Sequence, residues 1–404
     1  MDLDQLDSRI DSLSAVAENK QYKKQKNSLQ RELDSFLASI PGHKNLMSAS
    51  PKDVVRFLAW KDKGGRTKVH SPQCRFFSLP SHKASSSCGC PTRLAAGTVN
   101  SLIGKLRSIF IAAGRGDSWN NILGVGNPAA HPTVKTYLIS IQEEQAQARV
   151  TPKQAVPIFF DKLQILCNHL RAAAFASDAS PVQRYVSARD LAFFCLEFFS
   201  ADRASDLGRV LTKEVGRLPS GEGLLFNHTF GKTLRGGNAN IFMVKTCQDH
   251  IVCPVANLDL YVRLCDAMKV NLRDGYLFRT LNSKGEVSDN PFMGSAVANR
   301  LTRHLKDVGI HSGETMHSFR SGCSITLSLL GISPEDVASH VGWRTRESFD
   351  HYCQINKVLG MDHVASTLAS STSAPSTDAE PAAATVGRKF TSRNSLKDIA
   401  QAFL

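Results

Sequence analysis

The sequence predicts a mainly α-helical protein with a small β-sheet in its second half, divided into two folded parts. Most apolar residues recur at steps of three and four, which is the spacing of amphipathic helices. Three short runs, GLLFNHTF, NIFMVKT and HIVCPV, are instead rich in β-branched and aromatic residues and favour strands. Pro152 and Pro157 interrupt the helical pattern between the two parts, because proline disfavours a continuous helix.

Each predicted part has its own pattern. The first 45 residues read as a helical arm, with apolar residues at helical spacing from Leu3 to Val16 and from Leu29 to Leu37. TVNSLIGKLRSIFIAAG and HPTVKTYLISIQEEQAQAR are the clearest helices of the next part. The predicted segments are an arm at 1–45, a first domain at 46–150, a linker at 151–157, a second domain at 158–356, and a low-complexity tail with a C-terminal helix at 357–404.

The net charge and the distribution of cysteines indicate which classes of protein this chain can belong to. The formal net charge is +13, and such a surface attracts polyanions, with nucleic acid as the leading candidate. Most of the ten cysteines stand singly among apolar residues, which is typical of reduced thiols in an intracellular protein rather than of a disulfide framework. No apolar run approaches the length of a membrane span, and the polar, acidic N-terminus does not look like a secretory signal.

A loop of the first domain carries a candidate metal site. KVHSPQCRFFSLPSHKASSSCGCP contains His70, Cys74, Cys88 and Cys90, an adequate set for a closed tetrahedral zinc site. The spacings are less usual than paired C-x2-C, and His82 is a rival ligand. Unrelated residues in a loop are the alternative interpretation, and spacing alone does not decide between the two.

The second domain carries residue types suited to phosphate chemistry. Arg203 follows an apolar helix in CLEFFSADRASDLGRV, and on a helix His317 and Arg320 would share a face. Each residue alone has an ordinary explanation, such as a surface ion pair or a packing tyrosine, so only their order is informative. In chain order the candidate set is Arg203 with Asp206 beside it, Lys232, His317, Arg320, Trp343 and Tyr352.

This order resembles that of the tyrosine recombinase (phage integrase) family, of Crypton-like or retrotransposon type, throughout residues 158–356. RASDL around Arg203 fits the family's first arginine motif, and the 23-residue step from Arg320 to Trp343 matches its spacing. The resemblance implies an α+β catalytic domain that breaks and rejoins DNA through a 3′-phosphotyrosine at Tyr352. It also implies chemistry that requires neither ATP nor a catalytic metal.

The chemistry accounts for these residue types. Arg203 and Arg320 can clamp the charge that develops on the non-bridging oxygens, with Asp206 orienting Arg203. His317 can take the proton of the nucleophile. The family uses a hairpin lysine to protonate the leaving 5′-oxygen, and Lys232 matches it, with Lys245 as the fallback.

The family's third phosphate-binding position has two candidates. It lies nine residues before the nucleophile and directly follows a glycine, and Trp343 meets both conditions. His340 lies twelve residues before Tyr352 and meets neither. An indole N–H can donate to a phosphate oxygen but cannot shuttle a proton, so acid–base work would be left to His317 and Lys232.

The first domain has a second resemblance, to the ALOG domain of plant developmental regulators. GRTKVHSPQC, CGCPTRLAAG, SLIGKLRSIF, GNP and QAQAR carry it, from Phe57 to about Arg149. The long segment between Cys74 and Cys88 departs from the family pattern. The resemblance implies a helical DNA-binding domain with a zinc-ribbon-like insert, which would clamp duplex DNA together with the catalytic domain. Candidate phosphate contacts are Arg93, Lys105 and Arg107.

These observations predict a structural zinc, double-stranded DNA as the partner, a homo-oligomer on DNA, no membrane partner, and a nuclear location if the source is eukaryotic. An active recombinase encoded by, or derived from, a mobile element is the leading interpretation. A domesticated DNA-binding regulator that kept the fold and lost catalysis is the alternative. A type IB topoisomerase would use similar chemistry, but the zinc-bearing first domain argues against it.

Overall fold

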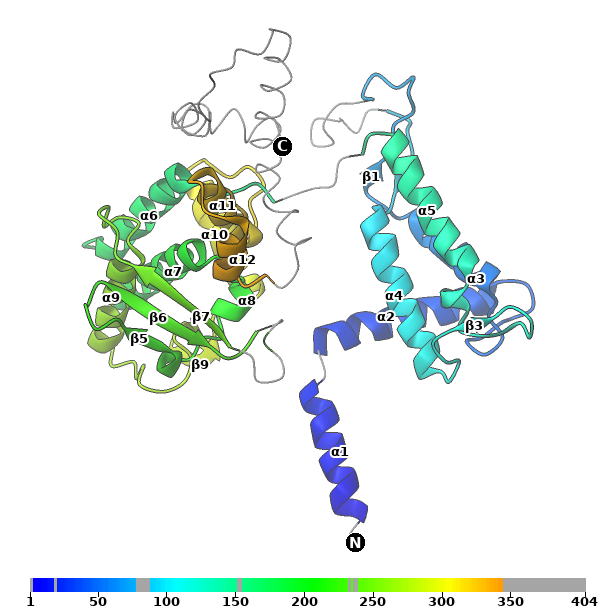
Figure 1. Ribbon diagram of the computed structural model, residues 1–404, viewed down its shortest axis with the longest axis horizontal. Helices are drawn as coiled ribbons and strands as arrows, with labels where there is room; N and C mark the ends of the chain where they lie inside the picture. Colours follow the sequence, from blue (N-terminus) through cyan, green and yellow to red (C-terminus); the bar gives the residue numbers. More distant parts are fainter. Residues whose placement is uncertain are drawn as a thin grey trace, which may run out of the picture. The chain divides into compact units, whose positions relative to one another are not determined.

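The structure is a computed structural model that describes residues 3–17, 20–77, 88–150, 155–231, 234 and 239–343. It divides into two compact units, residues 1–153 and 154–404. Its regular elements are mainly α-helices, with small antiparallel sheets, as the sequence predicts (Figure 1). Several predicted features lie outside the described residues: His82, part of the linker, Lys232, Tyr352 and the tail at 357–404.

The first unit is helical and carries two very short β-ribbons. In the ribbons, β1 pairs with β2 and β3 with β4, both antiparallel. The elements are α1 (Leu3–Ala17), α2 (Lys20–Ser39), α3 (Pro51–Asp62), β1 (Thr67–Lys68), β2 (Thr92–Arg93), α4 (Ala96–Ala112), β3 (Trp119–Asn120), β4 (Val125–Gly126), a 3-10 turn (Pro128–Ala130) and α5 (Pro132–Gln147).

The predicted arm at 1–45 is two helices with different roles. The helix α2 opens with a basic stretch, and its second half belongs to the core of the first unit, with Leu29, Leu33 and Leu37 buried. These leucines pack against residues of α3 and α4, and the boundary predicted at residue 45 stays a prediction. On α1, by contrast, Leu3 and Ile10 are exposed.

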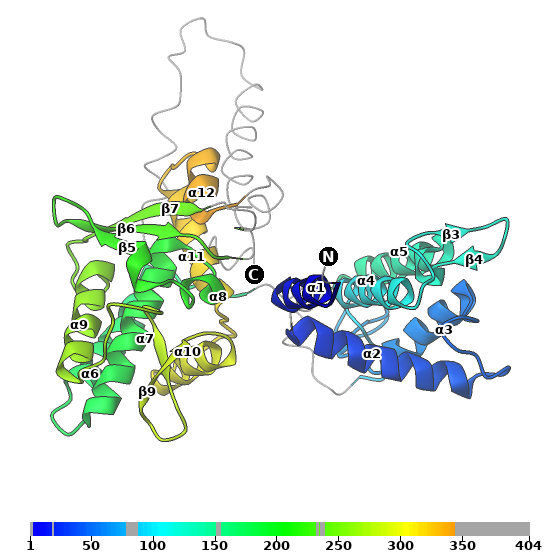
Figure 2. The same cartoon turned by 90° about the horizontal axis from the view of Figure 1, so that it is seen from below.

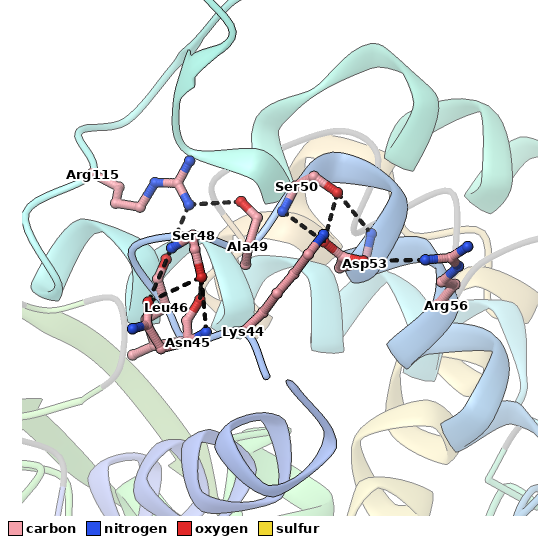
Figure 3. Close-up of polar contacts among 9 residues, drawn as sticks. All are labelled: Lys44, Asn45, Leu46, Ser48, Ala49, Ser50, Asp53, Arg56 and Arg115. Carbon is pink, nitrogen blue, oxygen red and sulfur yellow. Dashed lines mark hydrogen bonds and ion pairs between the residues drawn. The ribbon is translucent and has the colours of Figure 1, made fainter. Parts of the chain in front are cut away.

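A buried carboxylate organises the loop between α2 and α3 (Figure 3). Asp53 forms a capping box with Ser50 and an ion pair with Lys44 at 2.6 Å. Arg115 donates to the carbonyls of Leu46 and Ala49. Burial alone would raise the pKa of Asp53, but the hydrogen bonds from Lys44 and Ser50 outweigh it and lower this pKa to about 2.

Replacing this carboxylate should therefore destabilise the start of α3. We expect Asp53→Asn to lower the free energy of unfolding by ~2 kcal/mol at pH 7. The stabilisation is present above the unfolded-state pKa of ~3.9 and is lost as pH falls toward a pKa of about 2. Hydrogen exchange of the α3 amides at pH 7 measures the loss. Arg56→Ala, which removes an exposed partner of the same carboxylate, is the control.

The second unit surrounds one long helix, α7, which is buried on nearly every side. Helices α6, α9 and α11 pack against it, and the sheet lies over α7 and α9 (Figure 2). The elements are α6 (Phe160–Phe175), α7 (Pro181–Ser200), α8 (Ala204–Leu207), a 3-10 turn (Thr212–Glu214), β5 (Val215–Arg217), β6 (Gly223–His228), β7 (Asn240–Lys245), α9 (Pro254–Ala267), β8 (Arg279–Leu281), β9 (Val287–Pro291), α10 (Ser295–Asp307), α11 (His317–Leu329) and α12 (Pro334–Val341).

Two of the three predicted strands are confirmed and the third is wrong. GLLFNH and NIFMVK form β6 and β7, but the third strand of this sheet is β5, in the order β5-β6-β7. HIVCPV is instead a turn that leads into α9. The side chain of Cys253 caps this helix, and Pro254 occupies its first turn. Proline at this position lacks only an N–H that a helix start leaves unpaired, so the segment starts a helix more readily than it continues a strand.

Candidate functional site

Arg203 lies at the turn between α7 and α8. Ala201 ends α7 in the left-handed conformation, with φ 49°, and Arg203 is the N-cap residue of α8. The Arg203 guanidinium meets Asp206 at 3.3 Å, which is the ion pair that the sequence predicts. Gly231 lies against the same carboxylate, where an added Cβ would sit 3.1 Å from Oδ2 of Asp206. The segment that leads into Lys232 therefore passes beside the Arg203–Asp206 pair.

Arg320 reaches this turn from α11. Its side chain is buried, and Nη1 donates to the carbonyl of Ala201 at 2.7 Å. Ala201 is only two residues before Arg203, so the fold brings the chain segments of both predicted clamp arginines together. His317 is exposed in the first turn of α11, one turn away from Arg320 on the same side of the helix.

Trp343 completes the cluster from the end of α12. Gly342 ends this helix with φ 71°, and an added Cβ would come 3.2 Å from the side chain of Asn240. A side chain at this position would be strained, so glycine permits the turn that leads to Trp343. The guanidinium of Arg320 lies 5.4 Å from the centre of the indole ring, a cation–π contact.

A small cavity of about 140 Å³ lies at this cluster. Arg203, Asp206 and Trp343 line it, together with Asn240 at the start of β7. The sequence predicts the first three as site residues. No motif in the sequence marks Asn240, which is brought to the cavity by the pairing of β7 with β6.

A buried acidic pair and a histidine stand behind the arginines. Asp202 lies 2.9 Å from Nδ1 of His228. Burial alone would lower the pKa of His228, but the adjacent Asp202 carboxylate outweighs it, and the pKa is raised. Glu197 is also buried, and burial followed by the charge of Asp202 raises the pKa of its carboxyl well above the usual range. Sequence reasoning missed all three residues, because each is polar in a segment that reads as core.

The rival residues for two positions are placed elsewhere. Nε2 of His340 lies 2.8 Å from the carbonyl oxygen of Phe199, where it can join α12 to α7. Lys245 ends β7 opposite Gly223, whereas Asn240 lines the cavity at the start of that strand. Five residue steps along a strand span roughly 17 Å, so Lys245 is remote from the cavity.

In the first unit, His70, Cys74, Cys88 and Cys90 come together. Their ligand atoms all lie within 4.8 Å of one another. Nδ1 of His70 is 3.5 Å from Sγ of Cys74 and 3.6 Å from Sγ of Cys88. Tetrahedral zinc, with Zn–N of about 2.0 Å and Zn–S of about 2.3 Å, places such atoms about 3.6 Å apart. The four residues thus form a cluster whose geometry is compatible with zinc.

Local structure supports this cluster. The β1–β2 ribbon brackets it, and Lys68 donates to the carbonyls of Cys88 and Cys90. A backbone hydrogen bond from Ser71, and then one with His70, lower the pKa of the Cys90 thiol to about 7. A thiol that ionises readily suits a metal ligand, because the thiolate is the binding form.

The three residues predicted to contact phosphate in the first unit differ in how far other protein groups already occupy their side chains. Arg107 is exposed on α4, although one nitrogen lies 3.4 Å from the carbonyl of Asp117. Lys105 donates to Gln25 at 2.9 Å. Arg93 pairs with Asp62 at 3.2 Å, so this arginine already has an acidic partner.

Comparison with known proteins identifies the family of the first unit. Residues 11–143 match the ALOG domain. The protein LIGHT-DEPENDENT SHORT HYPOCOTYLS 5 of Arabidopsis thaliana is 36% identical over 142 residues, which are 34% of this chain and 72% of that protein. The chain belongs to the ALOG domain family. Protein G1-like9 of Oryza sativa subsp. indica is also 36% identical over 142 residues, and there the match spans 45% of the relative.

The ALOG domain accounts for about a third of the chain, and solved structures resemble a larger share. The XerH site-specific recombinase bound to difH substrate is 12% identical, with a TM-score of 0.48 over 80% of this chain and 72% of that chain. A λ integrase dimer bound to a COC′ core site is 13% identical, with a TM-score of 0.45 over 86% of this chain and 75% of that chain. At such values the similarity does not assign an activity. Within the described part of the chain, no helix is long and apolar enough to cross a bilayer.

Proposed function

We propose that this protein binds double-stranded DNA and breaks and rejoins it as a tyrosine recombinase, through a 3′-phosphotyrosine at Tyr352. One observation carries the proposal: Arg320 binds the turn that holds Arg203 and also contacts Trp343, beside a cavity that Arg203 and Trp343 line. Three residues predicted from their order in the chain thus meet at one place.

Each residue has a chemical role in this proposal. Arg203 and Arg320 bind the non-bridging oxygens of the scissile phosphate, and Asp206 holds Arg203 in position. The indole N–H of Trp343 donates to the same phosphate. His317 accepts the proton of the Tyr352 hydroxyl, and Lys232 protonates the leaving 5′-oxygen. The phosphotyrosine conserves the energy of the phosphodiester, so rejoining needs no ATP.

The proposal extends to the setting of this chemistry. The basic ALOG unit would bind duplex DNA beside the catalytic unit, with zinc holding its Cys–His loop. The active form would be a homo-oligomer assembled on DNA. In a eukaryotic host the protein would act in the nucleus, and its gene would belong to, or descend from, a mobile element.

Capture of the covalent adduct tests the proposal. Duplexes are first selected from a randomised pool by their binding to the full-length protein. They are then nicked, so that the 5′-hydroxyl fragment released by cleavage diffuses away. We expect an adduct that survives denaturation, with the DNA attached to the peptide that contains Tyr352. Tight binding to the selected duplexes with no adduct on any of them would reject the recombinase activity.

That negative outcome would favour a second function, a DNA-binding regulator without catalysis. The ALOG match favours this candidate, because this domain resembles that of plant developmental regulators. The covalent adduct separates the two candidates, since both require DNA binding and only one requires a nucleophile.

The choice between Trp343 and His340 gives a first prediction about this site. We expect Trp343→Ala to reduce cleavage by roughly 10²- to 10³-fold, because it removes a phosphate donor and a ring packed on Arg320. His340→Ala should cost less in cleavage, because that ring contacts a backbone carbonyl instead. Single-turnover cleavage of the nicked duplex measures both. Loss of cleavage in a folded His340→Ala protein, with Trp343→Ala tolerated, would show that the register is wrong.

The choice between Lys232 and Lys245 as the general acid gives a second prediction. We expect Lys232→Ala to slow cleavage by roughly 10²-fold or more, because it removes the general acid. Lys245→Ala should cleave at a rate near that of the unmodified protein, since Lys245 lies at the far end of β7. A substrate with a 5′-phosphorothiolate leaving group needs no proton and should restore cleavage by Lys232→Ala. Failure of this rescue would argue against Lys232 as the acid.

A further inference from the structure

We propose that His169, His304 and Asp307 form a binding site for a divalent transition-metal ion, with zinc as the best fit, that joins α6 to α10. One ligand atom from each residue lies within 4.8 Å of the other two. This site is separate from the Cys–His cluster of the ALOG unit and from the cavity beside Arg203. It goes beyond the proposed recombinase activity and does not depend on it.

The helices present the three side chains together. His304 and Asp307 are three residues apart on α10 and therefore share a face, while His169 comes from α6. The two imidazole rings lie 5.5 Å apart at an angle of 60°. Ligand atoms around tetrahedral zinc are about 3.3 Å apart, so the side chains must close in slightly. Asp307 is 46% exposed, and its ion pair with Arg303 is long, at 3.8 Å, so its carboxylate can move toward the two rings.

The orientation of His304 is the strongest support. Its ring is buried, and Nε2 lies 3.0 Å from a carboxylate oxygen of the fully buried Asp190 on α7. Arg300 also lies 3.1 Å from Nε2 and pairs with the same carboxylate. Since a guanidinium only donates, the acceptor that both groups share is Asp190, and the ring proton belongs on Nε2.

This tautomer leaves a lone pair on Nδ1 of His304. Nδ1 is buried and has no hydrogen-bond partner among the described residues. Buried polar atoms without partners are uncommon, and an unrecorded ion is one of the ordinary reasons for them. A histidine whose other nitrogen donates to a carboxylate is also the usual arrangement of metal-binding histidines, because the carboxylate fixes the tautomer and orients the ring.

The donor set indicates the class of metal. Two imidazole nitrogens and one carboxylate suit zinc and its neighbours among the transition metals, whereas calcium and magnesium prefer sets made of oxygen. Three protein ligands leave a fourth position for water. The ion would join α6 and α10 directly, and Asp190 already links His304 of α10 to α7.

Zinc stoichiometry of the full-length protein tests this site. The protein is equilibrated with zinc in a chelator buffer and assayed by elemental analysis, starting from a Cys88→Ser background in which the ALOG cluster is disabled. We expect this background to retain about one zinc per chain, and His169→Ala to lose it. Asp307→Asn, which alters an exposed side chain and should fold normally, should weaken zinc binding by roughly 10-fold or more. His250→Ala, an exposed histidine of the same unit, is the control and should bind as the background does.

The outcomes are distinct. Retention of zinc by a folded His169→Ala protein, or unchanged zinc affinity in Asp307→Asn, would overturn the site. So would a Cys88→Ser background that retains no zinc. Because the readout is metal content, none of these results depends on DNA cleavage, and a failed adduct assay would leave this inference standing.

Discussion

Tyr352→Phe is expected to abolish the covalent protein–DNA adduct while leaving DNA binding nearly unchanged. The substitution removes one oxygen, the proposed nucleophile, and keeps the aromatic ring. Loss of a nucleophile typically costs on the order of 10⁴-fold or more in rate. DNA affinity should be retained, because it depends on lysine and arginine contacts to phosphates that the substitution does not touch.

Two assays on the same nicked duplex measure this result. Denaturing gels report the adduct, and titration at fixed salt reports the affinity. Tyr276→Phe, at a half-buried tyrosine of the second unit, is the matched control and should form the adduct normally. A phosphotyrosine adduct formed by Tyr352→Phe would show that another residue is the nucleophile.

Cys88→Ser should remove one zinc per chain and destabilise the ALOG unit. The Cys88 thiol lies 3.6 Å from Nδ1 of His70, and a serine hydroxyl is a far weaker zinc ligand than a thiolate. The strands β1 and β2 that bracket the cluster have only two residues each, too few to hold the loop by backbone pairing alone. Structural zinc sites contribute folding free energy directly, so we expect a loss on the order of several kcal/mol.

Elemental analysis and thermal unfolding, with and without a chelator, measure both effects. Cys247→Ser, a half-buried thiol of the second unit, should keep its zinc and its response to chelator. DNA affinity should fall in Cys88→Ser if the ALOG unit carries part of the interface. An unchanged zinc content in Cys88→Ser, with α3 to α5 still folded, would contradict the assignment of this ligand.

Local signals in the sequence were sufficient where a helix carries its own start and stop. The helix α12 begins at Pro334 behind the Ser333 cap and ends at Val341 before Gly342, and α4 ends at Ala112 shortly before Gly114. Serine, proline and glycine are residue types that start and stop helices at such places. The four metal-binding candidates could also be found, because Cys and His in one loop are a chemical signal that does not depend on the rest of the chain. Their distances required the structure.

Other features depended on partners distant in the sequence. The three-residue strand β5 exists because β6 pairs with it, and three residues are too few to show a periodicity. Strands β8 and β9, of three and five residues, also exist through their pairing with each other, and no pattern in the sequence predicted them. The sequence shows the leucine stripe of α2. Whether this stripe faces solvent or a core depends on the apolar side chains of α4 that pack against it.

By itself, the sequence determined the fold class, the helices with strong caps, the zinc-compatible set, and the order of residues that resembles a recombinase. The tertiary structure decided which of them meet. It brought Arg320 to the turn before Arg203, separated Trp343 from His340, and aligned His304 with His169. The physical reason is that a helix start is specified by neighbours in the chain, whereas a site is specified by side chains that only the packing of distant segments brings within bonding distance.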